Sequence, residues 1–359
     1  MTMNRWMMAA FTAAMACAGC GKSALEPEVN VTLTGKVLKE DKQPLADALL
    51  RINRASNSEC IFLLFDGIDW KKLKTGTDGA FSMELLGADT RYGDTARCFE
   101  VHAPGSGQGD SLYAWFLMQD ENVQVPVLQQ WTGSPSSAAT ADGVSVSFKP
   151  ISDTQADASG EHTLSVTQKS SGAIWKSDSV HSPVLLNDDL LEDVDTSASV
   201  SLYRLELPGS NTHFNIYYQG APVALPKRAR VPVSRGASCT YTGAPATCPL
   251  TDGQLGGSTS FQNGMREVVI QLPQAKVLRK AVLRNLELSF HPTAFVLEGS
   301  SDGTQWVSLA NLMEGTPKTR GFIELPLSNP TPVSQVRLRA TSSSDQDHLV
   351  TLNELSLFE

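Results

Sequence analysis

Hydrophobic and polar residues alternate over short runs along most of the chain, a period of two that is typical of strands with one buried face. The clearest run is residues 294–309, where Phe295 and Leu297 occupy every second position before a Ser-Asp-Gly turn. A return strand follows this turn, and Trp306 is expected to anchor it in the core. In the C-terminal third, helical periodicity is limited to weak hints near 309–314. The pattern therefore predicts an all-β protein.

Stretches rich in Gly, Ser and Pro divide these runs into three segments. Residues 29–131 and 144–232 are predicted to be tandem β-sandwiches joined by a linker at 132–143, and residues 234–359 form the third segment. The middle segment is interpreted as an immunoglobulin- or fibronectin-like sandwich with Trp175 in its core.

Composition narrows the class of protein. Of the 359 residues, 41% are hydrophobic, which is enough for several packed cores. The formal net charge of −9 argues against nucleic acid as a partner. The basic cluster at 227–230 lies between prolines and is interpreted as a solvated connector. The acidic turn at 190–194 is interpreted as a solvated loop, with a calcium site as the alternative.

The N-terminus carries a targeting pattern. A short basic start precedes an apolar run at 6–16 that is too short to span a bilayer, and Cys-Ala-Gly-Cys follows at 17–20. This arrangement resembles the lipobox of bacterial lipoprotein signal peptides. Cys17 departs from the pattern, because the family usually has Leu at that position.

The lipobox resemblance implies that residues 1–19 are a signal peptide, that Cys20 is acylated, and that residues 20–28 form a tether. No later run reaches 18 apolar residues, so membrane contact is expected through the lipid anchor only. Gly21 replaces the Asp that often marks inner-membrane retention, which favours the outer membrane of a bacterial envelope. Ordinary secretion is the alternative.

Four of the six cysteines remain after residue 20, an even number that predicts two disulfides in an exported chain. Three pairings are open. The pairs Cys60–Cys98 and Cys239–Cys248 are preferred because each lies within one predicted segment. No Cys-x-x-Cys spacing remains after residue 20 and the histidines are scattered, so a structural zinc site is not expected.

Three stretches of the first segment occur as Thr-Gly-Lys-Val at 34–37, Pro-Leu-Ala-Asp-Ala at 44–48 and Thr-Asp-Gly-Ala-Phe at 77–81. Together they resemble the carboxypeptidase regulatory-like (prealbumin-like) domain. The resemblance implies a seven-stranded sandwich over residues 29–131 that serves as a spacer or interaction domain without catalytic residues. The insert at 54–73 departs from that pattern.

Five stretches of the third segment occur in the order of another family. They lie at 250–253, 268–272, 295–306, 336–339 and 352–358. They resemble the coagulation-factor type C (discoidin-like, galactose-binding-like) domain, and the Glu-x-Ser-x-Asp-Gly-x-x-Trp core is the most specific of them. The resemblance implies an eight-stranded jelly roll that binds glycans, phospholipid head groups or proteins through loops at one end.

The discoidin-like resemblance also implies site residues. One structural Ca²⁺ would be held by backbone carbonyls with Asp252 and Glu354, oxygen ligands that suit this ion. The alternative is that Asp252 only shapes a turn and Glu354 faces solvent. Loop aromatic, Arg, His and Asn side chains are candidates for ligand binding. These candidates are Phe261, Asn263, Arg266, His291 and Arg320.

The spacing Gly-x-Ser-x-Gly at 299–303 occurs in serine hydrolases, but there it requires a strand-to-helix turn. Here a strand follows, so a hairpin turn is predicted and no active site is assigned. The sequence therefore predicts a non-enzymatic envelope lipoprotein that binds a glycan or an envelope protein. The alternatives are a structural scaffold or assembly subunit, and an accessory module of a secreted hydrolase system.

Overall fold

The computed structural model describes residues 24–55, 70–150, 162–206, 212–241, 244–246, 248–256, 259–261, 267–285, 295–312, 321–328, 330–340 and 350–359. Regular structure in this part of the chain is almost entirely β-strand, with two short 3-10 helices, η1 (Gly87–Thr90) and η2 (Asp188–Leu190). The predicted all-β fold is confirmed. No helix within the described ranges is long and apolar enough to cross a membrane.

The chain divides into two compact units. Unit 1 consists of Met1–Gly133, Asp153–Gly160 and Leu202–Gly220. Unit 2 consists of Ser134–Ser152, Glu161–Ser201 and Ala221–Glu359. The middle segment delimited from the sequence therefore contributes residues to both units.

One sheet of unit 1 is organised around β1 (Asn30–Leu38), in which alternating residues such as Leu33 are fully buried. Strand β1 pairs antiparallel with β4 (Ala80–Leu86) and parallel with β9 (Asn122–Gln124) and β10 (Leu128–Gln129). The period-two pattern thus produces a strand with one buried face, as the sequence predicts. A small separate hairpin is formed by β5 (Arg91–Tyr92) and β6 (Thr95–Ala96).

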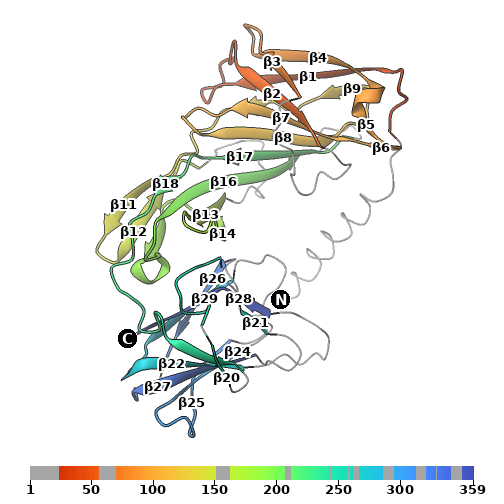
Figure 1. The fold of residues 1–359 in the computed structure, drawn as a ribbon. Helices are drawn as coiled ribbons and strands as arrows, with labels where there is room; N and C mark the ends of the chain where they lie inside the picture. The colour runs from red at the N-terminus through yellow and green to blue at the C-terminus, as the bar shows by residue number, and fades with distance from the viewer. Residues whose placement is uncertain are drawn as a thin grey trace, which may run out of the picture. The chain divides into compact units, whose positions relative to one another are not determined.

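The second sheet of unit 1 has its strands in the order β3 (Lys71–Lys74), β2 (Leu49–Arg54), β7 (Cys98–Pro104), β8 (Ser111–Leu117), β17 (Phe214–Gln219). Figure 1 shows β17, in green, lying along β8, with which it pairs antiparallel. The sequence assigned this strand to the middle segment. Alternation fixes which face of a strand is buried but not which strand is its neighbour, so this pairing was not predictable from periodicity.

Unit 2 contains two small groups of strands from the middle segment and from residues 132–143, which were predicted to be a linker but form strand β11 (Ser136–Thr140). The first has the order β11, β12 (Gly143–Ser147), β15 (Val184–Asn187). The second contains β14 (Ile174–Val180), β13 (His162–Gln168) and the first part of β16 (Thr196–Glu206), whose residues from Leu202 onward belong to unit 1. Strand β18 (Val223–Ala224) pairs with the start of β16. Trp175 in β14 is fully buried.

The rest of unit 2 is a sandwich of antiparallel strands. Its larger sheet has the order β20 (Ala244–Ala246), β19 (Ser238–Tyr241), β22 (Glu267–Lys276), β27 (Val333–Ala340), β24 (Phe295–Ser300), β25 (Val307–Leu312). The opposing strands are β26 (Gly321–Pro326), β23 (Lys280–Asn285) and β29 (Glu354–Phe358). A further pair is formed by β21 (Thr259–Phe261) and β28 (Val350–Leu352).

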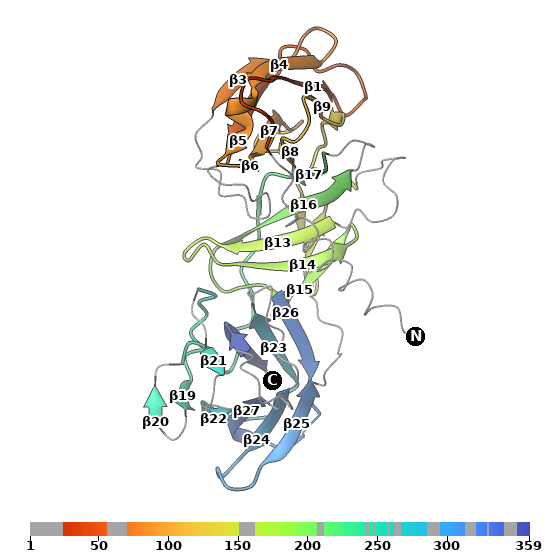
Figure 2. The ribbon, with the colours of Figure 1, turned by 90° about the vertical axis from the view of Figure 1, so that its right-hand side faces the viewer.

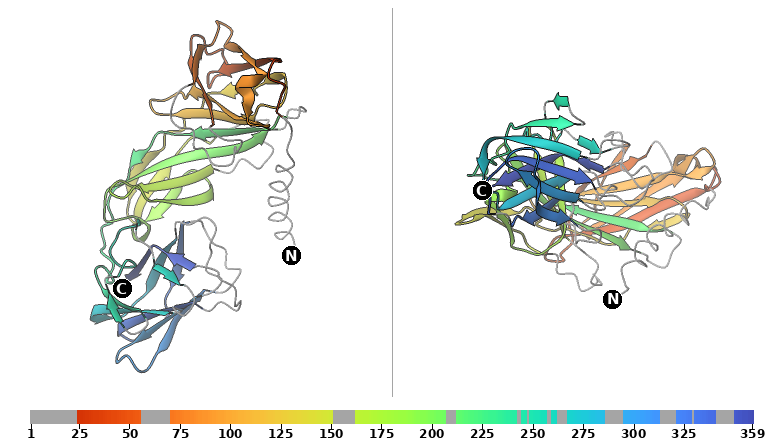
Figure 3. Two further views of the ribbon diagram at one scale, coloured as in Figure 1. Left: turned by 45° about the vertical axis from the view of Figure 1, so that its right-hand side comes forward. Right: turned by 90° about the horizontal axis from the view of Figure 1, so that it is seen from below.

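One hydrophobic cluster fills the space between these sheets. It includes Ile270, Leu297 and Leu338 from the larger sheet and Leu283 and Leu355 from the opposing strands. Figure 2 shows β22, β27, β24 and β25 side by side with β23 and β26 in the neighbouring layer. In Figure 3 the same strands, coloured cyan to blue, gather into one body. Two antiparallel sheets around one core are the architecture expected of a jelly roll.

Candidate functional site

The predicted turn between β24 and β25 is a hairpin turn held by side chains. The Ser300 hydroxyl accepts the N–H groups of Asp302 (3.3 Å) and Gly303 (2.9 Å). An Asp302 carboxylate oxygen accepts the N–H groups of Thr304 (2.8 Å) and Gln305 (2.9 Å). The N–H groups of Gln305 and Thr304 hold the pKa of Asp302 well below its usual range. Because β25 pairs antiparallel with β24, Gly-x-Ser-x-Gly lies in a hairpin and not in a strand-to-helix turn.

Trp306 does not lie in the core, so its predicted position was wrong. It is only partly buried, and the guanidinium of Arg337 lies 4.3 Å from its ring centroid. The same guanidinium donates from Nε to Glu298 Oε2 at 2.8 Å. Strand β25 begins one residue later, at Val307, so Trp306 belongs to the end of the turn. A cation–π contact covers it on the outer face in place of core packing.

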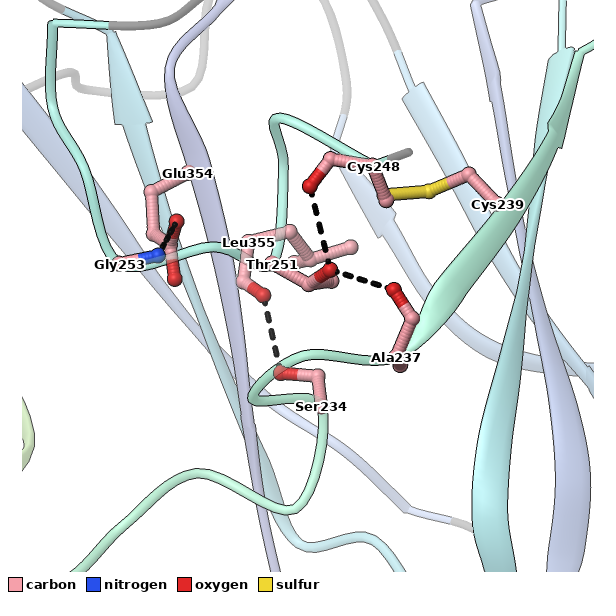
Figure 4. The surroundings of a disulfide bond; sticks show 8 residues. All are labelled: Ser234, Ala237, Cys239, Cys248, Thr251, Gly253, Glu354 and Leu355. Atoms are coloured by element: carbon pink, nitrogen blue, oxygen red, sulfur yellow. Dashed lines mark hydrogen bonds between the residues drawn. A yellow bond between two sulfur atoms is a disulfide. The ribbon is translucent and has the colours of Figure 1, made fainter. Parts of the chain in front are cut away.

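The start of the C-terminal sandwich is bonded to its last strand. The Ser234 hydroxyl donates to the carbonyl of Leu355 (3.0 Å) and accepts the N–H of Leu357 (3.0 Å). The N–H of Leu355 donates to the carbonyl of Leu250 at 2.7 Å. Figure 4 shows Ser234 and Leu355 beside the disulfide. The two ends of the sandwich therefore meet where the resemblance implies a calcium ion.

The predicted disulfide between Cys239 and Cys248 is confirmed. Both cysteines are buried, and their Cα atoms are 5.0 Å apart. Cys98 is buried at the start of β7, but Cys60 lies outside the described residues, so the pairing of these two remains a prediction.

The two predicted calcium ligands have different surroundings. Glu354 is 1% exposed, and its Oε2 accepts the N–H of Gly253 at 3.1 Å. Its Oε1 pairs with the guanidinium of Arg235 at 3.3 Å. Asp252 is exposed, and its carboxylate accepts the N–H of Gln254 at 2.7 Å. Both carboxylates therefore already accept hydrogen bonds from the protein.

The electrostatics around Glu354 follow from burial and its neighbours. Burial raises the pKa of Glu354 to about 8, Arg235 and the Gly253 N–H oppose this rise, and Glu192 and Asp252 add to it. Calcium requires six to eight oxygen ligands, and a guanidinium in contact with one of those oxygens repels it. The residues as arranged therefore do not fit a calcium ion.

Two nearby backbone carbonyls, those of Gly253 and Leu255, also accept hydrogen bonds from side chains. The buried side chain of Gln168 donates to the carbonyl of Gly253 (3.0 Å) and accepts the N–H of Leu255 (3.0 Å). Asn353 donates to the carbonyl of Leu255 at 3.1 Å. Across the described ranges, no three His, Cys, Asp or Glu side chains gather in a group that would hold a metal.

The acidic turn and the basic connector, each interpreted as solvated, contact each other or the sandwich. Glu192 pairs with Arg228 (3.2 Å) and Arg284 (2.9 Å), and all three side chains are 1% exposed. Burial lowers the pKa of Arg228, and Glu192 opposes this effect. The guanidinium of Arg284 also lies 5.0 Å from the ring of Trp175 and 5.6 Å from that of Phe322.

Further ion pairs extend this contact. Asp189 pairs with Arg230 (2.8 Å) and Lys280 (3.0 Å), and Asp188 accepts the backbone N–H of Arg230 at 2.9 Å. The sequence signal was available, because the middle segment carries both a short acidic run at 188–195 and a short basic run at 227–230. Each was interpreted alone. Lys227, paired with Asp195 at the surface, and the largely exposed side chain of Arg230 match the solvated interpretation, whereas Arg228 does not.

The predicted ligand-binding residues are not brought together by the described part of the chain. Asn263, Arg266, His291 and Arg320 lie outside the described residues. The backbone of Phe261 in β21 pairs with Val350 in β28. Cys20 also lies outside the described residues. These assignments remain predictions.

No protein-family model matches the chain, and no curated protein matches its sequence. The chain does resemble solved structures over about a third of its length. Its match to a family 89 glycoside hydrolase from Clostridium perfringens, in complex with 2-acetamido-1,2-dideoxynojirmycin, has 18% identity and a TM-score of 0.30. That match covers 36% of this chain and 14% of the hydrolase.

Two isolated modules are matched over almost their whole length. CpGH89CBM32-5 from Clostridium perfringens, in complex with GalNAc-β-1,3-galactose, is 15% identical over 36% of this chain and 100% of the module, with a TM-score of 0.30. The family 32 carbohydrate-binding module from Streptococcus pneumoniae EndoD is 11% identical over 36% of this chain and 99% of the module, with a TM-score of 0.29. Values this low assign the chain neither a family nor a ligand.

Proposed function

We propose that this protein is a non-enzymatic, lipid-anchored component of a bacterial envelope that binds a glycan through loops at one end of its C-terminal sandwich. The observation that carries the proposal is the stretch 295–306, the most specific part of the discoidin-like resemblance. In the structure this stretch makes strand β24 and the turn that leads to β25 in a two-sheet antiparallel sandwich. The lipobox resemblance at 17–20 supports the anchor and favours the outer membrane.

The residue types and the charge favour a glycan among the ligands of discoidin-like domains. The candidates Phe261, Asn263, Arg266, His291 and Arg320 combine a ring that stacks on the apolar face of a sugar with polar groups that bond its hydroxyls. The formal net charge of −9 opposes binding to anionic phospholipid head groups. A protein partner in the envelope is the second choice.

A structural role is the second candidate function, and one observation favours it. The buried contacts of Glu192 with Arg228 and Arg284 join the middle segment of unit 2 to its C-terminal sandwich. A protein that only spaces or assembles envelope components benefits from such a fixed connection.

A glycan array and a pull-down from envelope fractions test the proposal with the chain from Gly21 onward. We expect saturable binding to a sugar that is lost when Phe261 and Arg266 are both replaced by Ala. The matched control is Arg279→Ala, which removes an exposed arginine before β23 and leaves binding unchanged. Binding to neither sugars nor envelope fractions, by a chain shown to be folded, would contradict the proposal and favour the structural role.

A further inference from the structure

Arg235, at the start of the C-terminal sandwich, contacts both the last strand of that sandwich and the middle segment. Its Nη1 is 3.3 Å from Glu354 Oε1 in the last strand. Its Nη2 donates to Asp193 Oδ1 at 3.0 Å, and its Nε lies 3.0 Å from Asp193 Oδ2 as an ion-pair contact. Asp193 is a residue of the middle segment. The Arg235 side chain is 18% exposed, and Arg235 itself belongs to the turn that opens the C-terminal sandwich. One guanidinium thus bonds two carboxylates that are distant in sequence.

The neighbouring loop is shaped to admit this guanidinium. A Cβ atom on Gly253 would lie 1.8 Å from Arg235 Nη1, so the side chain passes directly over this glycine. Gly253 also has a φ of +79°, and its N–H donates to the other oxygen of Glu354. Glycine is therefore favoured here by its backbone conformation, and any larger residue would displace the Arg235 guanidinium.

We propose that Arg235 takes the place of a bound cation at this junction. The start of the sandwich is then held to its last strand without calcium. The guanidinium supplies the positive charge that the buried carboxylate of Glu354 needs. Its planar fork also holds Asp193 through two parallel contacts, which a spherical ion does not orient in this way.

Replacement of a metal ion by Arg235 affects how the junction responds to its surroundings. A cation that is part of the chain neither dissociates nor is removed by chelators. The segment before β16, which carries Asp193, is fixed by the same side chain that ties the start of the sandwich to its last strand. The same guanidinium therefore contributes both to closure of the sandwich and to attachment of the middle segment.

The first test compares melting temperatures of the chain from Gly21 onward in calcium and in EDTA. We expect the two values to agree within about 1 °C, because no ion leaves the junction. Arg235→Ala should lower the melting temperature by at least about 5 °C, since a largely buried carboxylate loses its partner. The matched control, Arg279→Ala, removes an exposed arginine of the same unit and should change it by less than about 2 °C.

A double-mutant cycle isolates the pairing with Glu354. At a pH above about 8 Glu354 is ionised, whereas the side chain of Glu354→Gln is neutral and has less need of a cation. Removing Arg235 in that background should therefore cost clearly less than in the unaltered chain. An equal loss in both backgrounds would overturn the proposal. So would a melting temperature of the unaltered chain that falls in EDTA, because a metal would then be closing the sandwich.

A second pair of variants tests the junction without touching its charges. Gly253→Ala and Gly303→Ala introduce the same methyl group at nearly the same φ, +79° and +78°. The added Cβ meets Arg235 Nη1 at 1.8 Å in the first and the end of the Gln335 side chain at 3.0 Å in the second. We expect the larger loss of melting temperature in Gly253→Ala. Equal losses would mean that displacing Arg235 is without consequence and would contradict the proposal.

Discussion

Replacing Glu192 by Gln should be among the most destabilising of the substitutions in unit 2 that exchange a charged side chain for an uncharged one. The carboxylate lies between two guanidinium groups, 3.2 Å from Arg228 Nη2 and 2.9 Å from Arg284 Nη2, and all three side chains are 1% exposed. Gln keeps the shape of the side chain but removes the charge that both arginines contact. Removing one partner of a buried ion pair costs about 3–5 kcal/mol, because the remaining charge stays buried without compensation.

The surroundings of Arg284 indicate that it does not escape to water when Glu192 loses its charge. Its Nη2 donates to the carbonyl of Leu190 at 2.7 Å, and its guanidinium lies against the rings of Trp175 and Phe322. Moving it into solvent would remove this hydrogen bond and the contacts with both rings. A cost of about 3–5 kcal/mol corresponds to a fall in melting temperature of roughly 6–20 °C for a unit of this size.

The assay is chemical denaturation of the unaltered chain, Glu192→Gln and Asp195→Asn, with circular dichroism showing that each variant is folded at the start. Asp195 is a matched control, because it lies three residues away and makes an exposed ion pair with Lys227. The side chain of Asp195 is 70% exposed and that of Lys227 is 57% exposed. An exposed pair of this kind contributes at most about 1 kcal/mol. If Glu192→Gln costs no more than Asp195→Asn, the argument from burial is refuted.

Three further predictions use the same denaturation assay. Trp175→Ala should lower the free energy of unfolding by about 3–5 kcal/mol, because this ring is buried. Trp306→Ala should lower it by only about 1 kcal/mol, because this ring is covered on one side by a cation. Similar costs would contradict these placements. Replacing Cys239 and Cys248 together by Ala should cost about 2.6 kcal/mol, since the bridge closes a short loop, and an unchanged midpoint would be the contrary result. Backbone N–H groups lower the pKa of Asp302 in the folded chain. The contribution of this carboxylate to stability is therefore complete above the unfolded pKa of about 4 and is lost as the pH falls below that value. The unaltered chain should therefore lose melting temperature relative to Asp302→Asn between pH 7 and pH 3, and a constant difference would show that this carboxylate does not contribute in that way.

The strands were largely predictable because a strand with one buried face has hydrophobic residues at every second position. The alternating residues of β1 and the hairpin of β24 and β25 lie where the period of two and the turn chemistry placed them. Strand β17 shows the limit of this signal. Its alternation identified a buried face, but its neighbour β8 is about a hundred positions away, and pairing over that distance depends on the packing of the whole unit.

Side-chain positions were predictable only where the strand register determined them. Trp306 was assigned to the core because large aromatic residues usually are buried, yet it precedes β25 by one residue and so is not bound by the alternation of that strand. The pairing of Glu192 with Arg228 and Arg284 was missed for a related reason. A run of charges gives no information about burial until its partners are known. Here Glu192 in the acidic turn is compensated away from water by Arg228 of the connector and Arg284 of β23.

The predicted calcium ligands show how one residue changes the chemistry of a matched motif. Asp252 and Glu354 occupy the positions that the resemblance implies, and Glu354 is buried as a ligand would be. The deciding residue is Arg235, which lies outside the motif and reaches Glu354 across Gly253. A buried carboxylate requires a positive partner, but that requirement does not specify whether the partner is an ion or a side chain. Arg235 meets it within the chain, which is why a matched pair of acidic residues does not by itself predict a metal.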